Sequence, residues 1–297
     1  MEYKVFKDIG LASEVPQEYK NIWVHFVYDV KHDGRHRARL VADGHLTDIP
    51  VDSVYSGVVS LRGFRLLIFL AELNGLEVWR TDISSAYLEA YTKEKVCIVA
   101  GPEFRELEGY CLLVHKALYG LQSSGARWHD KFATCMRAEG FFPCHAEPDI
   151  WMRPAGDHYK YVAVYVDDLA FAVDNPQQFV DRLRDKHNFK LKGTGPIDYH
   201  LGANFLRDQD GTLTMSPKKY IVERMATSYL SMFGEKPKTK CKSLLEKNDH
   251  PETDISDLLD AKGIQQYQSL IGSLQWTVIL GCYNIQCTVI TMCFILY

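Results

Sequence analysis

Residues 159–173 read YKYVAVYVDDLAFAV, and this stretch decides the fold class. Two arms rich in β-branched and aromatic residues flank one charged dipeptide, Asp167-Asp168, which predicts a β-hairpin whose arms are packed in a core. Two adjacent carboxylates at the tip of such a hairpin raise the pKa of one of them unless a cation compensates the charge. A solvated turn is the alternative interpretation, because aspartate is a common turn residue.

Helices and strands are predicted on both sides of this hairpin. Residues 63–73 indicate a buried helix that ends at Asn74-Gly75, and residues 76–82 alternate like a strand that ends at Asp82. The remaining elements are helices over 126–139, 176–186 and 216–230, short strands over 189–191, 204–206 and 212–215, and a polar linker over 231–260. Because this order lacks a regular βαβα rhythm, the sequence favours the α+β class.

A second hairpin is predicted near the N-terminus. Apolar and aromatic residues over 23–28 lead to the turn 31–34, which contains Asp-Gly, and to a return arm over 35–42. Period-2 alternation puts Arg35, Arg37 and Arg39 on one face of that arm. This face is either a solvated charged surface or a cationic finger that grips phosphate.

Composition limits the function classes. The chain has 297 residues with a formal net charge of −4, so it does not bind nucleic acid through bulk positive charge. Its 46% hydrophobic and 24% charged residues exclude a wholly disordered chain. The eight cysteines form no C-x-x-C pair, and no apolar leader begins the chain, so we expect reduced thiols and no secretion.

A third carboxylate, Asp82, joins the pair at the hairpin tip if the two predicted strands are neighbours. Three carboxylates offer oxygen ligands only, which suits Mg²⁺. Two metal ions held in this way activate an attacking oxygen and stabilise a leaving one in phosphoryl transfer.

Several ordered blocks of the chain resemble one family. The segment Tyr165-Val166-Asp167-Asp168 resembles the catalytic hairpin of reverse transcriptases, and residues 80–88 resemble the strand that carries their first catalytic aspartate. Residues 116–121 and 126–128 are similar to the Leu-Tyr-Gly-Leu block of copia-type LTR retrotransposons (Pseudoviridae). Further blocks of that family match residues 37–44, 198–203 and 267–274. The likeness spans about residues 23–280, and several motifs in order are more specific than any one of them.

The resemblance implies a right-hand polymerase fold. Its fingers would begin in residues 1–76, its palm with interleaved fingers segments would occupy 77–215, and a truncated thumb or connection would occupy 216–297, with no RNase H or integrase region. The implied activity is RNA-directed DNA synthesis with two Mg²⁺ ions, or Mn²⁺ in their place. The implied partners are an RNA template, a DNA primer, dNTPs and other retrotransposon polyprotein products, without a membrane. The implied location is cytoplasmic virus-like particles, with the nucleus as a second site.

The resemblance also assigns residues. Asp82, Asp167 and Asp168 fall on the catalytic, metal-binding carboxylates, and Tyr165 and Val166 support them in the hairpin. The nucleotide-binding positions are Arg37, Arg39, Tyr87 and Gln122. Arginine suits a triphosphate because its planar fork binds phosphate oxygens bidentately. Tyr87 falls where the family places an aromatic residue that excludes a ribose 2′-hydroxyl, although a core aromatic is the alternative.

Two departures support a second hypothesis. Residues 122–128 read QSSGARW where many family members have KQAPRAW, and Ser123 stands where a nucleotide- or template-contacting glutamine often sits. After Leu280-Gly281 the family's arginine and aspartate are replaced by Cys282 and its neighbours. The alternative is therefore a degenerate, inactive fragment that only binds nucleic acid or partner proteins. The apolar tail over 276–297 is expected to begin as a packed helix, with a membrane span as the minor alternative.

Overall fold

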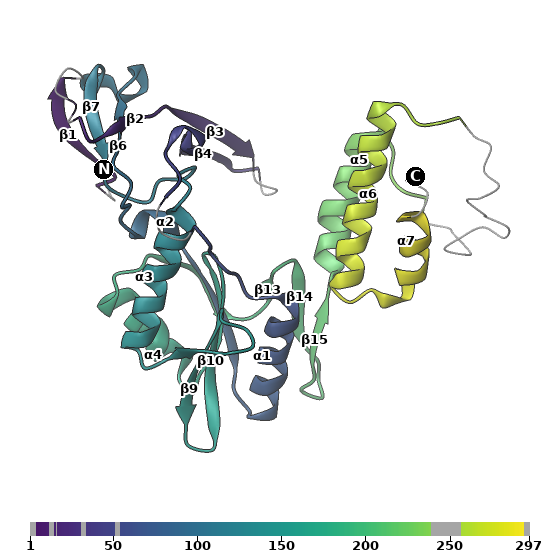
Figure 1. The fold of residues 1–297 in the computed structure, drawn as a ribbon. Helices are drawn as coiled ribbons and strands as arrows, with labels where there is room; N and C mark the ends of the chain where they lie inside the picture. The colour runs from purple at the N-terminus through teal and green to yellow at the C-terminus, as the bar shows by residue number, and fades with distance from the viewer. Residues whose placement is uncertain are drawn as a thin grey trace. The chain divides into compact units, whose positions relative to one another are not determined.

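The computed structural model describes residues 4–11, 15, 17–30, 34–50, 54–238 and 257–293 (Figure 1). The chain forms two compact units, Met1–Pro196 and Ile197–Tyr297. The division after Pro196 lies ahead of position 216, where we expect the thumb to begin. Both units contain strands and helices, which confirms the predicted mixture of helix and sheet.

An antiparallel six-stranded sheet organises the first unit. Its strand order is β12-β5-β11-β10-β9-β8. The strands are β12 (Leu191–Pro196), β5 (Val78–Ile83), β11 (Asp168–Ala172), β10 (His158–Tyr165), β9 (Ile150–Ala155) and β8 (Phe142–Pro143). The predicted hairpin is confirmed as β10 and β11, which pair from Tyr161↔Ala172 to Tyr165↔Asp168.

Helices cover both faces of this sheet, as Figure 1 shows. On one face, Val162, Leu169 and Phe171 pack in a core with residues of α3 (Ser124–Ala138) and α4 (Pro176–Asp181). On the other, α1 (Leu61–Leu73) contacts β10 and β11. The hairpin is therefore packed from both sides, and only its tip is free to carry polar chemistry.

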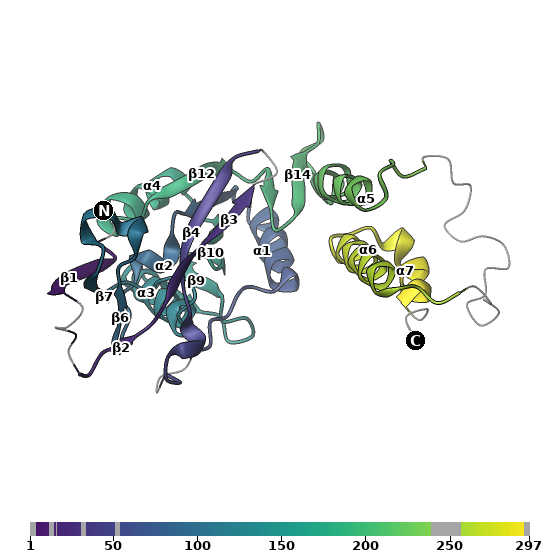
Figure 2. The ribbon, with the colours of Figure 1, turned by 90° about the horizontal axis from the view of Figure 1, so that it is seen from above.

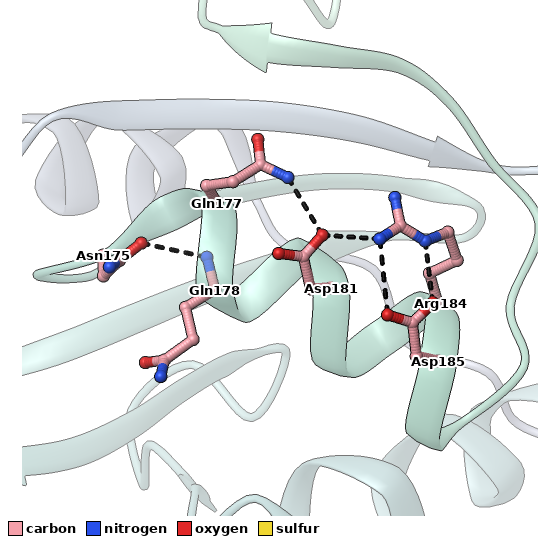
Figure 3. A network of polar contacts seen from close by, with 6 residues as sticks. All are labelled: Asn175, Gln177, Gln178, Asp181, Arg184 and Asp185. Carbon is pink, nitrogen blue, oxygen red and sulfur yellow. Dashed lines mark hydrogen bonds and ion pairs between the residues drawn. The ribbon is translucent and has the colours of Figure 1, made fainter.

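Capping side chains fix the starts of two helices: α1, which begins two residues before the predicted position 63, and α4, which begins at the predicted position 176. The Ser60 hydroxyl accepts a hydrogen bond from the Gly63 amide at 3.0 Å, which fixes the start of α1. Asn175 Oδ1 accepts from the Gln178 amide at 2.9 Å and starts α4 in the same way (Figure 3). The helix predicted over 176–186 continues past Asp181 as the π-helical segment η4 (Arg182–Lys186), where Arg184 donates to Asp181 at 2.6 Å.

A two-stranded hairpin and a four-stranded sheet complete the first unit. The hairpin pairs β3 (Val24–Val30) with β4 (His36–Ala42), as predicted; of its predicted turn, residues 31–33 lie outside the described residues. It is hydrogen-bonded to neither of the larger sheets, and Figure 2 shows β3 and β4 as two neighbouring strands of one ribbon. The four-stranded sheet has the order β1-β7-β6-β2, with β1 (Phe6–Leu11), β7 (Tyr110–Val114), β6 (Val96–Val99) and β2 (Lys20–Asn21).

The second unit combines a small sheet with helices. The sheet contains β13 (Tyr199–His200), β14 (Ala203–Arg207) and β15 (Leu213–Ser216). The helical segments are η5 (Tyr220–Met225), α5 (Ala226–Phe233), α6 (Ala261–Ile279), η7 (Tyr283–Ile285) and α7 (Gln286–Cys293). Most of the predicted linker, residues 239–256, lies outside the described residues.

The start of the tail is helical, as expected. The Tyr267 hydroxyl of α6 donates to the Met292 carbonyl at 2.8 Å, which ties α6 to α7. Among the residues that the structure describes, none of the helices combines the length and apolar character that a membrane crossing needs.

A close backbone approach joins β4 to the loop before α3. We call it the glycine clasp, and it consists of Ala42, Gly44, Tyr119 and Gly120. The Ala42 amide donates to the Tyr119 carbonyl at 2.7 Å. A Cβ atom on Gly44 would lie 2.0 Å from the Gly120 carbonyl oxygen, and one on Gly120 would lie 2.0 Å from the Ala42 carbonyl oxygen. Neither position tolerates a side chain, because the opposing atoms are backbone.

We expect Gly120→Ala to destabilise the first unit by about 2–4 kcal/mol, because it adds a backbone clash to the strain of a positive φ. Gly120 has φ +92°. Gly109→Ala is the matched control: Gly109 has φ +82° but nothing within 4 Å of its Cβ position, so only about 1 kcal/mol is expected. Urea unfolding of both variants measures the difference, and equal losses would contradict the clasp.

Candidate functional site

The register of the six-stranded sheet brings two of the three candidate carboxylates together. Asp168 on β11 lies directly opposite Asp82 on β5. Residues directly opposite in an antiparallel pair project from the same face, with Cβ atoms about 4.5–5.5 Å apart. Lys192 on β12 flanks Asp82, and Tyr165 on β10 flanks Asp168, so one row of polar side chains crosses four strands.

The third carboxylate, Asp167, lies in the two-residue turn between β10 and β11. The Ile83 amide at the end of β5 donates to the Asp167 carbonyl at 2.8 Å. This bond fixes the turn against the strand that carries Asp82. The structure therefore brings Asp82, Asp167 and Asp168 to one end of one sheet.

The carboxylates influence each other's ionisation. Burial raises the pKa of Asp168 to about 6, helped by the charges of Asp167 and Asp82, while Arg80 opposes the change. Burial also raises the pKa of Asp167, and the charge of Asp82 adds to that rise. These shifts indicate that burial, together with neighbouring negative charge, disfavours the ionised carboxylates in the protein alone.

The chemistry of this donor set fits a divalent cation. Within the described part of the chain, no three His, Cys, Asp or Glu side chains converge closely enough to form a ready-made metal cage. The three carboxylates nevertheless supply only oxygen atoms, and their mutual repulsion is what a bound Mg²⁺ or Mn²⁺ would relieve. Asp82, Asp167 and Asp168 are the residues that would hold it.

Two arginines of β4 face this charge. Arg37 and Arg39 are two residues apart on one strand, so they share a face, opposite Asp29 and Val27 of β3. Both of them lower the pKa of Asp167, in opposition to its burial. The Arg39 Nε atom is buried with no hydrogen-bond partner among the described residues. Of the three arginines predicted on this face, Arg37 and Arg39 thus lie near Asp167.

Two tyrosines lie beside the carboxylates. Tyr87 belongs to the short helix α2 (Ala86–Glu89), and its ring centroid is 5.1 Å from that of Tyr119. Burial raises the pKa of both hydroxyls, and the charge of Asp167 raises them further. Arg37 and Arg39 act on Tyr119 in the opposite direction.

Tyr119 is a site residue that the sequence reasoning missed. The charges of Arg37, Arg39 and Asp167 all act on the pKa of its hydroxyl, so Tyr119 lies near both the cationic and the anionic side chains of the site. Its position in the Leu-Tyr-Gly-Leu block could have pointed to a site residue. That block was used only to identify the family, and no chemical role was assigned to its tyrosine.

Gln122 and Ser123 form structural contacts. The Gln122 amide donates to the Gly44 carbonyl at 2.9 Å and lies 3.4 Å from the Thr47 hydroxyl, so it reinforces the glycine clasp. The Ser123 hydroxyl donates to Glu94 Oε1 at 2.5 Å. Of the nucleotide-binding candidates, Arg37, Arg39 and Tyr87 are near the carboxylates, whereas the Gln122 amide is engaged by the clasp.

Comparison with known proteins identifies the family of the chain. A family model described as reverse transcriptase (RNA-dependent DNA polymerase) matches residues 6–235. The chain is 28% identical over 238 residues to a retrovirus-related Pol polyprotein from transposon TNT 1-94 of Nicotiana tabacum, covering 75% of this chain and 18% of that protein. It is 26% identical over 199 residues to a putative transposon Ty5-1 protein of Saccharomyces cerevisiae, covering 65% and 61%.

A third relative extends the match along the chain. The retrovirus-related Pol polyprotein from transposon RE1 of Arabidopsis thaliana is 24% identical over 247 residues, which cover 82% of this chain and 16% of that protein. The chain thus spans between 16% and 61% of the length of these three relatives. Because the family model covers well over half of the chain, and the relatives are Pol polyproteins and transposon proteins, the chain belongs to the reverse transcriptase family and is of the copia type.

Proposed function

We propose that this chain is the RNA-directed DNA polymerase domain of a copia-type retrotransposon. The observation that carries the proposal is the row of Asp82 and Asp168 beside Asp167, with Arg37 and Arg39 acting on Asp167. In this proposal the first 76 residues begin the fingers, residues 77–215 form the palm, and residues 216–297 begin the thumb or connection. The substrates are dNTPs, a DNA primer and an RNA template.

In this proposal each group of residues has a different role in the reaction. Asp82, Asp167 and Asp168 would hold two Mg²⁺ ions, which when bound supply Lewis acids for the primer 3′-hydroxyl and the pyrophosphate leaving group. Arg37 and Arg39 bind the triphosphate oxygens and orient the nucleotide toward the primer. In this proposal Tyr87, whose ring lies 5.1 Å from that of Tyr119, supports the sugar together with Tyr119 and discriminates against a 2′-hydroxyl.

A second candidate is an inactive copy that only binds nucleic acid or partner proteins. One observation favours it: the three carboxylates lie together, but no described trio of potential ligands has the closeness of a formed metal cage. The altered block over 122–128 points the same way. Primer extension by the wild-type chain separates the two candidates.

We expect Asp167→Asn to reduce primer extension by at least about 100-fold, because it removes a charge that the reaction needs next to the transferred phosphate. Binding of the primer–template duplex should change less than about 3-fold, since duplex affinity comes mainly from phosphate contacts elsewhere. The measurement is extension of oligo(dT) on poly(rA) with labelled dTTP, with fluorescence anisotropy for binding. Extension at the wild-type rate by this variant would refute the assignment of Asp167.

We expect Tyr87→Ala and Tyr119→Ala each to admit ribonucleotides, with the ratio of dNTP to rNTP efficiency falling by about 10-fold or more. Tyr119→Phe keeps the ring against Tyr87 and is the matched control, with selectivity within about 2-fold of wild type. Single-nucleotide incorporation kinetics with dTTP and UTP give the ratio. Unchanged selectivity in Tyr87→Ala would return that residue to a purely structural role.

The stability of the fold should report the burial of Asp168 and its repulsion from the neighbouring carboxylates. The pKa of Asp168 is about 6 in the folded chain against an ordinary 3.8, so the folded state binds the proton more tightly than the unfolded state. The metal-free protein therefore loses stability as pH rises from about 4 to about 6, and the loss persists above that range. We expect Asp168→Asn to raise Tm at pH 7.5 in EDTA by about 2–6 °C, but hardly at pH 4.

Thermal unfolding at both pH values checks this, and Mg²⁺ provides a second comparison. Mg²⁺ at pH 7.5 should raise the Tm of wild type more than that of Asp168→Asn, because the variant has less repulsion to relieve and one ligand fewer. A lower Tm for Asp168→Asn in EDTA would show that Asp168 is compensated by the protein itself.

A further inference from the structure

The turn that carries Asp167 has an unusual backbone. Tyr165 and Asp168 pair directly, which leaves Val166 and Asp167 as a two-residue turn. Val166 has φ +58°, whereas Asp167 is not among the residues with positive φ. Positive φ at the first central residue alone defines a type II′ turn, which favours glycine at that position. A β-branched residue is strained there, so other contacts must hold the turn in place.

Each of the two carbonyl groups of this turn accepts a hydrogen bond from a rigid element. The Trp128 indole Nε1 on α3 donates to the Val166 carbonyl at 2.7 Å. The Ile83 amide on β5 donates to the Asp167 carbonyl at 2.8 Å. The peptide group between Val166 and Asp167 is thus fixed by the indole, and the next one is fixed by the strand.

The indole itself has little freedom to move. The Trp128 residue is 2% exposed, and its ring lies 5.7 Å from that of Phe132 and 5.6 Å from that of Phe189. The donor is therefore placed by the core between the sheet and α3. Rotation of the Val166–Asp167 peptide would break its bond and convert the type II′ turn toward type I′, with positive φ at Asp167. That change would redirect the carboxylate of Asp167.

We propose that Trp128 is a positioning residue for the polymerase reaction: its indole N–H, through the Val166 carbonyl, holds the strained turn in the conformation that presents Asp167 beside Asp82. This inference rests on the proposed function. It assigns to Trp128, in the block over 126–128, a positioning role that is separate from its role in packing.

The competing explanation is that Trp128 is only a large core residue whose N–H finds a convenient acceptor. Trp151 provides the matched comparison. It is also 2% exposed and belongs to the same core cluster, but it lies on β9 and has no hydrogen bond to the turn. Replacing either tryptophan by phenylalanine removes the same side-chain volume, so the two variants differ only in the position that is changed.

The experiment compares Trp128→Phe with Trp151→Phe in primer extension at saturating primer–template. We expect kcat to fall by about 10- to 100-fold in Trp128→Phe, with the KM for dTTP and the Kd for primer–template within about 2-fold of wild type. Trp151→Phe should lose a similar amount of Tm and keep kcat within about 2-fold. Equal losses of kcat in the two variants would overturn the inference.

Rescue tests the strain directly. Glycine adopts positive φ without strain, so Val166→Gly should recover about 5-fold or more of the kcat that Trp128→Phe loses when the two changes are combined. An additive loss in the double variant would show that the indole does not act through the turn. If Trp128→Phe fails to fold, β-(3-benzothienyl)alanine at position 128 keeps the bicyclic ring and replaces only the N–H; the same loss of kcat is expected.

Hydrogen exchange, a measurement that does not depend on catalysis, separates this inference from the proposed function. The Ile83 amide is hydrogen-bonded to the turn, so its hydrogen exchange should become about 10-fold faster in Trp128→Phe and stay unchanged in Trp151→Phe. If the wild-type chain synthesises no DNA but the variants show this exchange pattern, the proposed polymerase activity is refuted, and the inference that Trp128 holds the turn stands. Unchanged Ile83 exchange in Trp128→Phe would overturn the link whatever the activity.

Discussion

The pairing register of β5 with β11 forces the carboxylates of Asp82 and Asp168 onto one face of one sheet. This constraint opposes ionisation, because burial first and the charges of Asp167 and Asp82 next raise the pKa of Asp168 to about 6. The sheet keeps the register because its other face is packed: Ile83, Leu169 and Phe171 follow the alternation of the same strands into the core against α3 and α4. A slip of one residue would separate the carboxylates, but it would also expose that apolar face. The core thus holds together charges that would otherwise move apart.

The cationic side of the site depends on a contact between segments far apart in the sequence. Arg37 and Arg39 lie on a two-stranded hairpin that belongs to neither of the larger sheets. The glycine clasp fixes this hairpin, because Gly120 lets the backbone of β4 approach the loop before α3. The same loop carries Tyr119, so one backbone contact places both the arginines and an aromatic ring near Asp167. The geometry therefore explains why position 120 of the Leu-Tyr-Gly-Leu block is a glycine: a side chain there would push β4, the strand that carries the arginines, away.

Local patterns predicted the parts of the site that lie within single elements. The hairpin at 159–173, the strand that ends near Asp82 and the arginine face of β4 all follow from period-2 alternation next to a turn, which neighbouring residues determine. The individual roles of Tyr119, Gln122 and Trp128 could not be found in this way. Gln122 is engaged by Gly44, 78 residues earlier, and Trp128 reaches Val166, 38 residues later. Such contacts exist only once the elements have packed, and no spacing in the sequence encodes them.

The turn at 165–168 combines two features that oppose stability. Val166 occupies a conformation that suits glycine, and Asp168 is a carboxylate whose burial and neighbours disfavour its charge. Glycine at 166 and asparagine at 168 would satisfy the backbone and the electrostatics better. Strain and uncompensated charge within one turn persist when the surrounding structure determines them and when they serve the chemistry. Here the surroundings are the indole of Trp128 and the edge of β5, two rigid donors on a packed core. The conformation of this turn is thus better explained by the carboxylates that it must present than by the stability of the fold.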